Sequence, residues 1–188
     1  MEIFPQAISP VMLLKPKRFG DARGYFSELY SRRSLAEHGF DFAFVQDNIS
    51  LSAEAGTLRG LHFQTAPSEQ TKLVSVLTGA IFDVVVDLRW SSPTFGHHVA
   101  VELSAENGWQ ILVPRGFAHG FCTLTPDTRV LYKVDGFHDP ERDFGLRWND
   151  PALGIAWPVA EKDAKLSAKD RVQPLLHELP KVFAYEGA

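Results

Sequence analysis

The chain has 188 residues, of which 45% are hydrophobic and 22% are charged, and its net charge is −4. We interpret residues 1–188 as one domain, large enough to bury a substantial core. The slightly acidic balance gives no reason to expect nucleic acid or an anionic membrane as a partner, so any bound anion needs a local group of cations.

Three further features of the sequence limit the class of protein to which the chain can belong. The longest apolar strand pattern, Ala80–Leu88, carries two aspartates and falls short of the roughly 20 apolar residues that a membrane helix needs. The first residues, Met1–Pro5, lack the basic and then apolar plan of a secretory signal. The single cysteine, Cys122, excludes an internal disulfide and a cysteine-rich zinc site. Together they predict a cytoplasmic protein with no membrane partner.

Most of the chain has the pattern of short strands, and helical patterning is scarce. Ser31–His38 begins with a capping serine and stops before a glycine, and Ser167–Asp170 predicts a short turn capped by its serine. The expected strands, in chain order, are Tyr25–Tyr30, Gln46–Ser52, Thr57–Gln64, Lys72–Thr78, Ala80–Leu88, His97–Leu103, Gln110–Val113, Ala118–Leu124 and Arg129–Phe137.

Turn residues separate these strands at short intervals, which favours an all-β jelly roll or closed sandwich with a few short peripheral helices. The segment Asp139–Pro158, rich in proline, aspartate and tryptophan, is expected to be irregular but packed. The apolar residues of the C-terminal tail, such as Leu175 and Val182, are expected to dock it on the body.

The expected strands carry several residues that suit acid–base chemistry. His62 and His119 lie in two glycine-containing strand segments, and Arg59 precedes the first of these histidines. Lys72 and Tyr132 lie on two further strands. A base, a phenol, an ammonium and a guanidinium on neighbouring strands suit proton transfer on a charged substrate.

Strand alternation predicts which way the side chains around His62 point. In a regular strand, His62 and Gln64 face one side, whereas Arg59, Leu61 and Phe63 face the other. Leu61 and Phe63 then fill the sandwich core, and His62 faces a separate cavity such as the lumen of a barrel.

Each of these residues also has a purely structural interpretation. His62 alone is typical of a hydrogen-bonded structural histidine, and Tyr132 of a packed ring with its hydroxyl at a polar rim. Lys72, like the arginine before His62, needs an anionic partner if it is buried. Asp83 or Asp87 can supply that partner, and a ligand phosphate is the alternative.

A metal site is a further alternative. The spacing around His62 and His119 follows the two motifs of metal-binding cupins, with Gln64 in place of a histidine and Thr123 in place of an asparagine. Two histidines and Glu69 can still form an open site for iron or manganese. The lost histidine and the two nearby cations disfavour this, and we expect no metal and no cofactor.

Eight blocks of the sequence together resemble one family, the dTDP-4-dehydrorhamnose 3,5-epimerases of the cupin fold. The blocks occur in the family's order over most of the chain: DARGYFSE (21–28), QDNISLS (46–52), GTLRGLHFQ (56–64), QTKLVSVLTGAIFDVVVDLRWSSPTFG (70–96), VPRGFAHGF (113–121), VLYKV (130–134), RWNDPALGIAWP (147–158) and LSAKD (166–170).

The resemblance implies a cupin-type jelly roll and cofactor-independent inversion of C3 and C5 in a dTDP-4-keto-6-deoxyhexose, the epimerase step of dTDP-rhamnose synthesis. It implies that His62 removes the proton and that Asp170 orients and stabilises its imidazolium form. Lys72 then stabilises the enolate oxygen, and Tyr132 returns a proton from the opposite face of the sugar.

The resemblance also implies two groups of binding residues. Within one chain, the family's diphosphate contacts match Arg59 and His119, and its nucleoside or other substrate contacts match Gln46, Asn48 and Lys169. Residues that cross from the partner subunit in the family match Arg23, Phe26 and Glu28. We therefore expect a homodimer with an exchanged N-terminal strand segment.

Two departures from the family pattern affect the nucleotide end. His138 stands where the family has the tyrosine that stacks on thymine, and Asp143 stands where it has a glutamate. The alternatives are therefore an epimerase that inverts only C3 or only C5, or one that uses another nucleotide. From other classes, a metal-dependent cupin enzyme and a catalytically silent sugar-binding cupin are the rivals.

Overall fold

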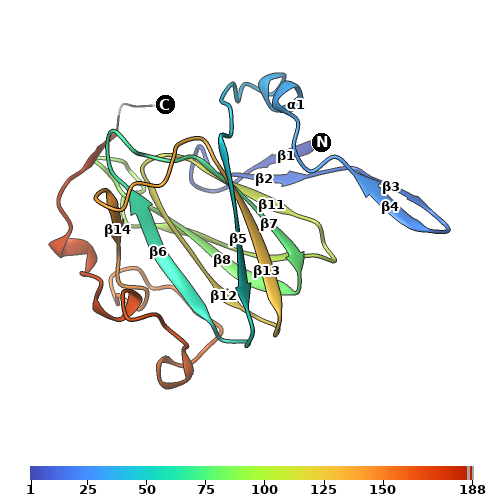
Figure 1. The fold of residues 1–188 in the computed structure, drawn as a ribbon. Coiled ribbons are helices and arrows are strands. Elements are labelled where there is room, and N and C mark those ends of the chain that lie inside the picture. The colour runs from blue at the N-terminus through green and yellow to red at the C-terminus, as the bar shows by residue number, and fades with distance from the viewer. Residues whose placement is uncertain (186, 188) are drawn as a thin grey trace.

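Two antiparallel sheets face each other in the computed structural model, which describes residues 1–185 and 187 (Figure 1). The first sheet has the order β1 (Glu2–Pro5), β2 (Met12–Lys15), β11 (Gln110–Val113), β7 (Lys72–Thr78), β13 (Thr128–Val134) and β5 (Gln46–Ser52). The second has the order β10 (His98–Ser104), β8 (Ala80–Asp87), β12 (Phe117–Thr123), β6 (Leu58–Gln64) and β14 (Asp143–Gly145). The expected all-β architecture is confirmed.

The remaining elements are short and lie around this sandwich. A hairpin of β3 (Arg18–Asp21) and β4 (Gly24–Ser27) projects from the body, as Figure 1 shows in blue. The others are α1 (Arg32–Ala36), β9 (Arg89–Trp90), β15 (Phe183–Ala184) and the 3₁₀ helices η1 (Glu161–Asp163), η2 (Asp170–Val172) and η3 (Leu176–Glu178). No helix among the described residues is long and apolar enough to cross a membrane.

The central strands of the second sheet carry apolar side chains on both faces. On β8, Val85 belongs to the apolar cluster between the sheets, whereas Val84 and Val86 belong to a cluster on the outer face. Leu61 and Phe63 of β6 lie in this outer cluster, which the C-terminal part of the chain covers. The prediction that these two fill the space between the sheets was therefore wrong. The tail supplies the second apolar layer, which leaves the inner face of β6 to polar side chains.

The sequence located most strands to within a few residues but missed the shortest ones. α1 begins after Ser31, whose hydroxyl accepts a hydrogen bond from the backbone of Ser34 at 3.3 Å, as its capping pattern predicts. The segment Asp139–Pro158 is largely irregular, yet it contains β14, which pairs with β6. The predicted strand Tyr25–Tyr30 ends earlier, at Ser27, because its residues pair only within the projecting hairpin.

Candidate active site

A cavity of about 340 Å³ lies between the two sheets and gathers seven of the fourteen predicted site residues. Its walls come from β5, β6, β7, β12 and β13, and from the turn that leads into η2. The predicted residues that line it are Asn48, Arg59, His62, Lys72, His119, Tyr132 and Asp170. The sequence thus identified the groups that the fold brings together from strands far apart in the chain.

Arg59 and His62 line the same cavity, which contradicts the prediction that they face opposite sides. In the pairing of β6 with β12, His62 lies opposite His119, but Arg59 lies opposite Phe121. Three residues along β6 therefore span the same length as two residues along β12, which is a β-bulge in β6. The bulge turns the side chain of Arg59 to the same side of the sheet as that of His62. Gly60 makes it possible, because a Cβ there would lie 2.5 Å from the Cα of Gly120.

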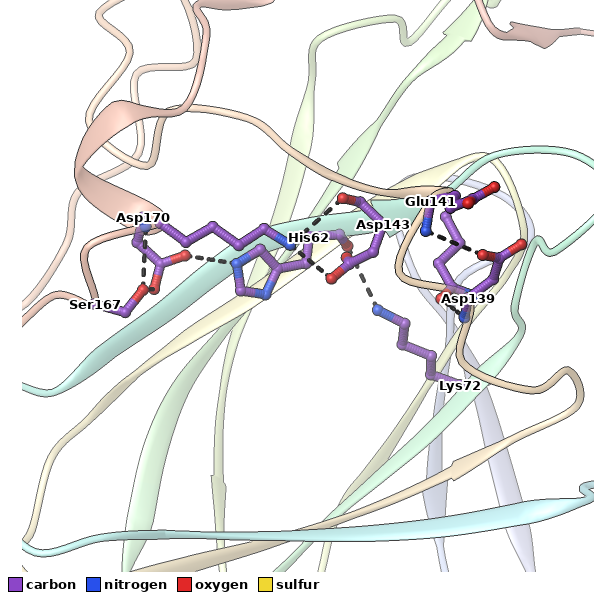
Figure 2. A network of polar contacts seen from close by, with 9 residues as sticks. His62, Lys72, Asp139, Glu141, Asp143, Ser167 and Asp170 are labelled. Atoms are coloured by element: carbon purple, nitrogen blue, oxygen red, sulfur yellow. Dashed lines mark hydrogen bonds and ion pairs between the residues drawn. The ribbon is translucent and has the colours of Figure 1, made fainter.

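His62 forms a hydrogen bond with a buried carboxylate. Its Nε2 lies 2.5 Å from Oδ1 of Asp170, whose side chain is 3% exposed against 32% for the histidine. Among the hydrogen bonds of residues 1–185 and 187, Nδ1 has no partner, and Figure 2 shows this second ring nitrogen turned away from Asp170. With Nε2–H donating to the carboxylate, Nδ1 is the nitrogen that can accept a proton.

The environment of Asp170 keeps its carboxyl group ionised. Burial alone raises the pKa of Asp170, but the contacts with His62, Ser167 and Lys169 together hold this pKa below its ordinary value. An ionised carboxylate beside an imidazole stabilises the imidazolium that forms when the ring takes a proton.

Lys72 lies beside the backbone of His62. Its Nζ donates to the backbone oxygen of His62 at 3.4 Å (Figure 2). Burial lowers the pKa of Lys72 to about 8, and the negative charges of Asp143 and Asp83 oppose that shift. The ammonium is therefore the main form at neutral pH, where it can stabilise an adjacent anion.

The two aspartates considered as partners for the buried cations have other partners. Asp83 bonds His119 at 2.8 Å, and Asp87 bonds Arg89 at 2.8 Å. Among the residues that the structure describes, no salt bridge reaches Arg59 or Lys72. Arg59 instead donates to Ser52 Oγ at 3.1 Å and to the backbone oxygen of Leu51 at 3.0 Å. The guanidinium and the ammonium therefore stay available for an anionic ligand.

Tyr132 approaches the cavity from the other sheet. Its hydroxyl lies 3.2 Å from Ser50 Oγ, and its ring packs edge-on against His119 with centroids 6.3 Å apart. Burial raises the pKa of Tyr132 above its ordinary value, and the hydrogen bond to Ser50 opposes this only in part. The phenol therefore stays protonated at neutral pH and can donate a proton.

The residues predicted for the nucleotide end form two small groups. Gln46 on β5 donates to Asn48 at 2.7 Å and accepts from the backbone of His138 at 3.4 Å. Asp143 on β14 forms an ion pair with Lys169 at 2.6 Å. Of these five residues, only Asn48 lines the cavity, so the other four lie beyond its wall.

The three residues expected from a partner subunit do not line this cavity in the described chain. Arg23 lies between β3 and β4, bonds Asp21, and has a side chain that is 90% exposed. Phe26 lies on β4, also exposed, and Glu28 follows that strand. Within one chain, the hairpin and the cavity are separate.

Gln64, which stands at a cupin metal-ligand position, is fully engaged with a loop. Its amide donates to the backbone oxygens of Ser68 at 2.6 Å and Phe137 at 3.3 Å, and its oxygen accepts from the backbone of Asp139 at 2.8 Å. It therefore fixes the loop that carries His138. Among the described residues, no three histidine, cysteine, aspartate or glutamate side chains gather as a metal-binding group.

Sequence reasoning missed two serines that touch the acid–base groups. Ser50 bonds Tyr132, and the hydroxyl of Ser167 bonds both the carboxylate and the backbone nitrogen of Asp170. Both lie in blocks that the family resemblance covers, but a lone serine carries no chemical signal of its own. Only the contact seen in the structure gives each serine a role.

Comparison with known proteins shows the family of this chain. A family model described as dTDP-4-dehydrorhamnose 3,5-epimerase matches residues 5–178. The chain belongs to this family. It is 52% identical to a dTDP-4-dehydrorhamnose 3,5-epimerase of Sinorhizobium fredii over 95% of this chain and 91% of that protein.

Solved structures of similar proteins have the same fold. The Bacillus anthracis dTDP-4-dehydrorhamnose 3,5-epimerase, solved with TDP and PPi bound, is 52% identical with a TM-score of 0.90, covering 93% of this chain and 98% of that one. The Legionella pneumophila dTDP-6-deoxy-D-glucose-3,5-epimerase, in complex with dTDP-4-keto-L-rhamnose, is 42% identical with a TM-score of 0.94, covering 99% of each. The fold is the cupin-type jelly roll of this epimerase family.

Proposed function

We propose that this member of the family is a cofactor-independent isomerase that inverts C3 and C5 of a dTDP-4-keto-6-deoxyhexose. The observation that carries the proposal is the arrangement of one cavity between two sheets. His62, which bonds Asp170 of η2, comes from one sheet, and Tyr132 comes from the sheet that faces it. Inversion through a planar intermediate needs a base on one face and an acid on the other.

The first step is removal of a proton by His62. The keto group at C4 acidifies the C–H bonds at C3 and C5, because the electron pair released there moves onto the C4 oxygen. Nδ1 of His62 takes the proton, and the ionised Asp170 stabilises the imidazolium through its bond to Nε2. The product of this step is an enolate whose negative charge lies mainly on the C4 oxygen.

Lys72 stabilises that enolate. Its ammonium lies in a buried position beside the backbone of His62 and is not neutralised by a salt bridge among the described residues. A preorganised cation in a site with little water interacts strongly with charge that develops during the reaction.

Tyr132 completes the inversion from the opposite face. Its hydroxyl gives a proton to the carbon as the C4 carbonyl re-forms, and the new C–H bond then points the other way. The phenolate left behind and the imidazolium of His62 return to their starting states by proton exchange with solvent. The same pair of residues serves C3 and C5 when each carbon is presented in turn.

Two side chains on the cavity wall suit the diphosphate of the substrate. Arg59 presents a guanidinium whose fork matches phosphate oxygens, and His119 is fixed by Asp83 beside it. Toward the nucleoside we place the two groups at the edge of the cavity, Gln46, Asn48 and His138 on one side and Asp143 with Lys169 on the other.

We propose that the active form is a homodimer. Arg23, Phe26 and Glu28 lie on or beside the projecting hairpin, outside the cavity of their own chain. Exposed aromatic residues on a hairpin are typical of a surface that another chain covers. In the dimer, the hairpin of one subunit reaches the cavity of the other and exchanges the N-terminal strand segment between them.

Proton exchange tests the activity. The protein is incubated with dTDP-4-keto-6-deoxyglucose in deuterated water, and NMR and mass spectrometry count the carbons that gain deuterium. We expect deuterium at C3 and C5, with conversion to dTDP-4-dehydrorhamnose and no loss of rate after treatment with a metal chelator. Deuterium at neither carbon refutes the proposal, and deuterium at one carbon identifies a single-carbon epimerase. Loss of activity with chelator supports the metal-dependent alternative.

A further inference from the structure

The turn before η2 holds a serine that no step above uses. Ser167 Oγ donates to Oδ2 of Asp170 at 2.7 Å and accepts from the backbone nitrogen of the same residue at 3.1 Å (Figure 2). The two bonds close a small ring through a single aspartate. They therefore fix the rotation of its side chain as well as its position.

The two oxygens of the Asp170 carboxylate have separate partners. Oδ1 bonds Nε2 of His62, and Oδ2 bonds the hydroxyl of Ser167. No other hydrogen bond to Oδ2 occurs among the described residues, and the side chain of Asp170 is buried. A buried carboxylate that loses its only donor on one oxygen turns toward another donor or gains a proton, and either change disturbs its second oxygen.

We propose that Ser167 is a positioning residue for the base of the reaction. Its hydroxyl holds the Asp170 carboxylate so that Oδ1 fixes His62 as the tautomer with a proton on Nε2, which keeps Nδ1 ready to accept a proton. This inference rests on the proposed function, because it assigns Ser167 a role through the base named there. Ser167 itself does not need to touch the reacting carbons.

The chain supplies a matched control for the backbone contact. Ser104 Oγ accepts from the backbone nitrogen of Asn107, three residues along, at 3.0 Å, just as Ser167 Oγ accepts from Asp170. Ser104 lies at the end of β10 and does not line the active-site cavity. Replacing Ser104 therefore removes a similar turn contact without affecting the base.

The kinetic experiment compares Ser167→Ala, Ser167→Thr and Ser104→Ala with the unchanged protein. We expect Ser167→Ala to lower kcat by about 10-fold, the scale of an orienting partner, while KM stays nearly constant. Ser167→Thr keeps the hydroxyl and should restore most of the rate, and Ser104→Ala should change neither constant. An unchanged kcat in Ser167→Ala, or an effect on KM alone, overturns the proposal. So does a folded Ser167→Thr variant that is as slow as Ser167→Ala.

A double-mutant cycle tests whether Ser167 acts through Asp170. In an Asp170→Asn background, Ser167→Ala should cause no further loss of kcat, because the carboxylate that it positions is gone. Losses that multiply overturn the proposal, since they show that the serine acts by another route.

A spectroscopic measurement on the free protein separates this inference from the proposed function. ¹⁵N NMR of the His62 ring reports which nitrogen carries the proton, and it needs no substrate. We expect mostly the tautomer protonated on Nε2 in the unchanged protein, and a larger share protonated on Nδ1 in Ser167→Ala. An identical tautomer ratio in both contradicts the positioning role even if the protein proves to be an epimerase. A shifted ratio supports the role even if the substrate is different.

Discussion

The cavity between the sheets and the β3–β4 hairpin are built in opposite ways. In the cavity, two histidines of the wall, His62 and His119, each bond a buried aspartate, and the lining residues come from elements far apart in the sequence. The hairpin pairs only with itself, and Phe26 on it is 70% exposed. The cavity has its acid–base groups in place within one chain, whereas the hairpin leaves apolar surface unburied.

This difference indicates that the cavity and the hairpin have separate roles. A two-stranded hairpin alone is marginally stable in water, so its exposed aromatic side chains need a surface to cover them. The edge strand β5 offers apolar surface of its own, with Ile49 61% exposed. We infer that proton transfer belongs to the cavity of one chain and that part of substrate binding belongs to the hairpin of the other.

If the cavity carries the proton chemistry, removal of its base has the largest effect. His62→Ala should abolish deuterium exchange at both C3 and C5, with a loss at the upper end of the roughly 10²–10⁴-fold expected of a general base. His177→Ala, outside the cavity, is the control and should exchange normally. Exchange that persists at either carbon in His62→Ala means that a second base acts there.

Replacement of the acid should separate exchange from inversion. Tyr132→Phe keeps the ring that packs on His119 and Phe121 but loses the hydroxyl. His62 can still remove a proton and return one to the same face, so exchange should partly survive while net inversion falls by about 10²-fold. Paired measurement of deuterium content and product configuration checks this. Equal loss of both contradicts separate roles and assigns Tyr132 to positioning or enolate stabilisation.

The pH dependence of turnover should reveal the charge on Lys72. The pKa of this group is lowered to about 8, and its charged form is the one that stabilises the enolate. The contribution of the Lys72 charge should therefore be complete below this pH, and turnover should fall roughly tenfold per unit as pH rises above it. The Lys72→Arg variant, whose guanidinium stays charged, should be slower, but its turnover should no longer fall as the pH rises above about 8. If turnover of this variant falls at high pH as before, another group causes the fall.

The hairpin should affect binding more than turnover. Arg23→Ala should raise KM by about 10-fold or more, the scale of a lost hydrogen bond to a charged ligand, and leave kcat nearly unchanged. Phe26→Ala should raise the dissociation constant of the dimer, measured by analytical ultracentrifugation. Arg33→Ala, an exposed arginine on α1, is the control for both measurements. A hairpin variant that is dimeric and kinetically normal refutes the assigned role.

The sequence predicted the site better than it predicted the local geometry. The types of His62, Lys72 and Tyr132 already indicated proton transfer, and the resemblance to the family added Asp170 as the partner of His62. The position of Arg59 was wrong, because a bulge in β6 depends on a partner strand that the sequence of β6 does not contain. β14 was missed since three residues carry too little pattern to identify a strand.

Two other features could not be read from a one-dimensional pattern at all. Leu61 and Phe63 were correctly expected to be buried, but alternation alone cannot say that the chain's own C-terminal tail covers their face. Ser167 was expected only as a turn cap, and its second bond, to the carboxylate of Asp170, depends on the fold of that turn.

Mixed dimers test most directly whether each site combines one chain's cavity with the other chain's hairpin. His62→Ala has an inactive cavity and an intact hairpin, whereas Arg23→Ala has an intact cavity and a defective hairpin. In a mixed dimer, exchange of hairpins gives one site with both parts intact and one with neither. We predict that mixing the two variants restores activity with the KM of the unchanged protein, at one of the two sites in each mixed dimer. If each hairpin serves its own chain, no site is repaired, and a mixture no more active than Arg23→Ala alone contradicts the account.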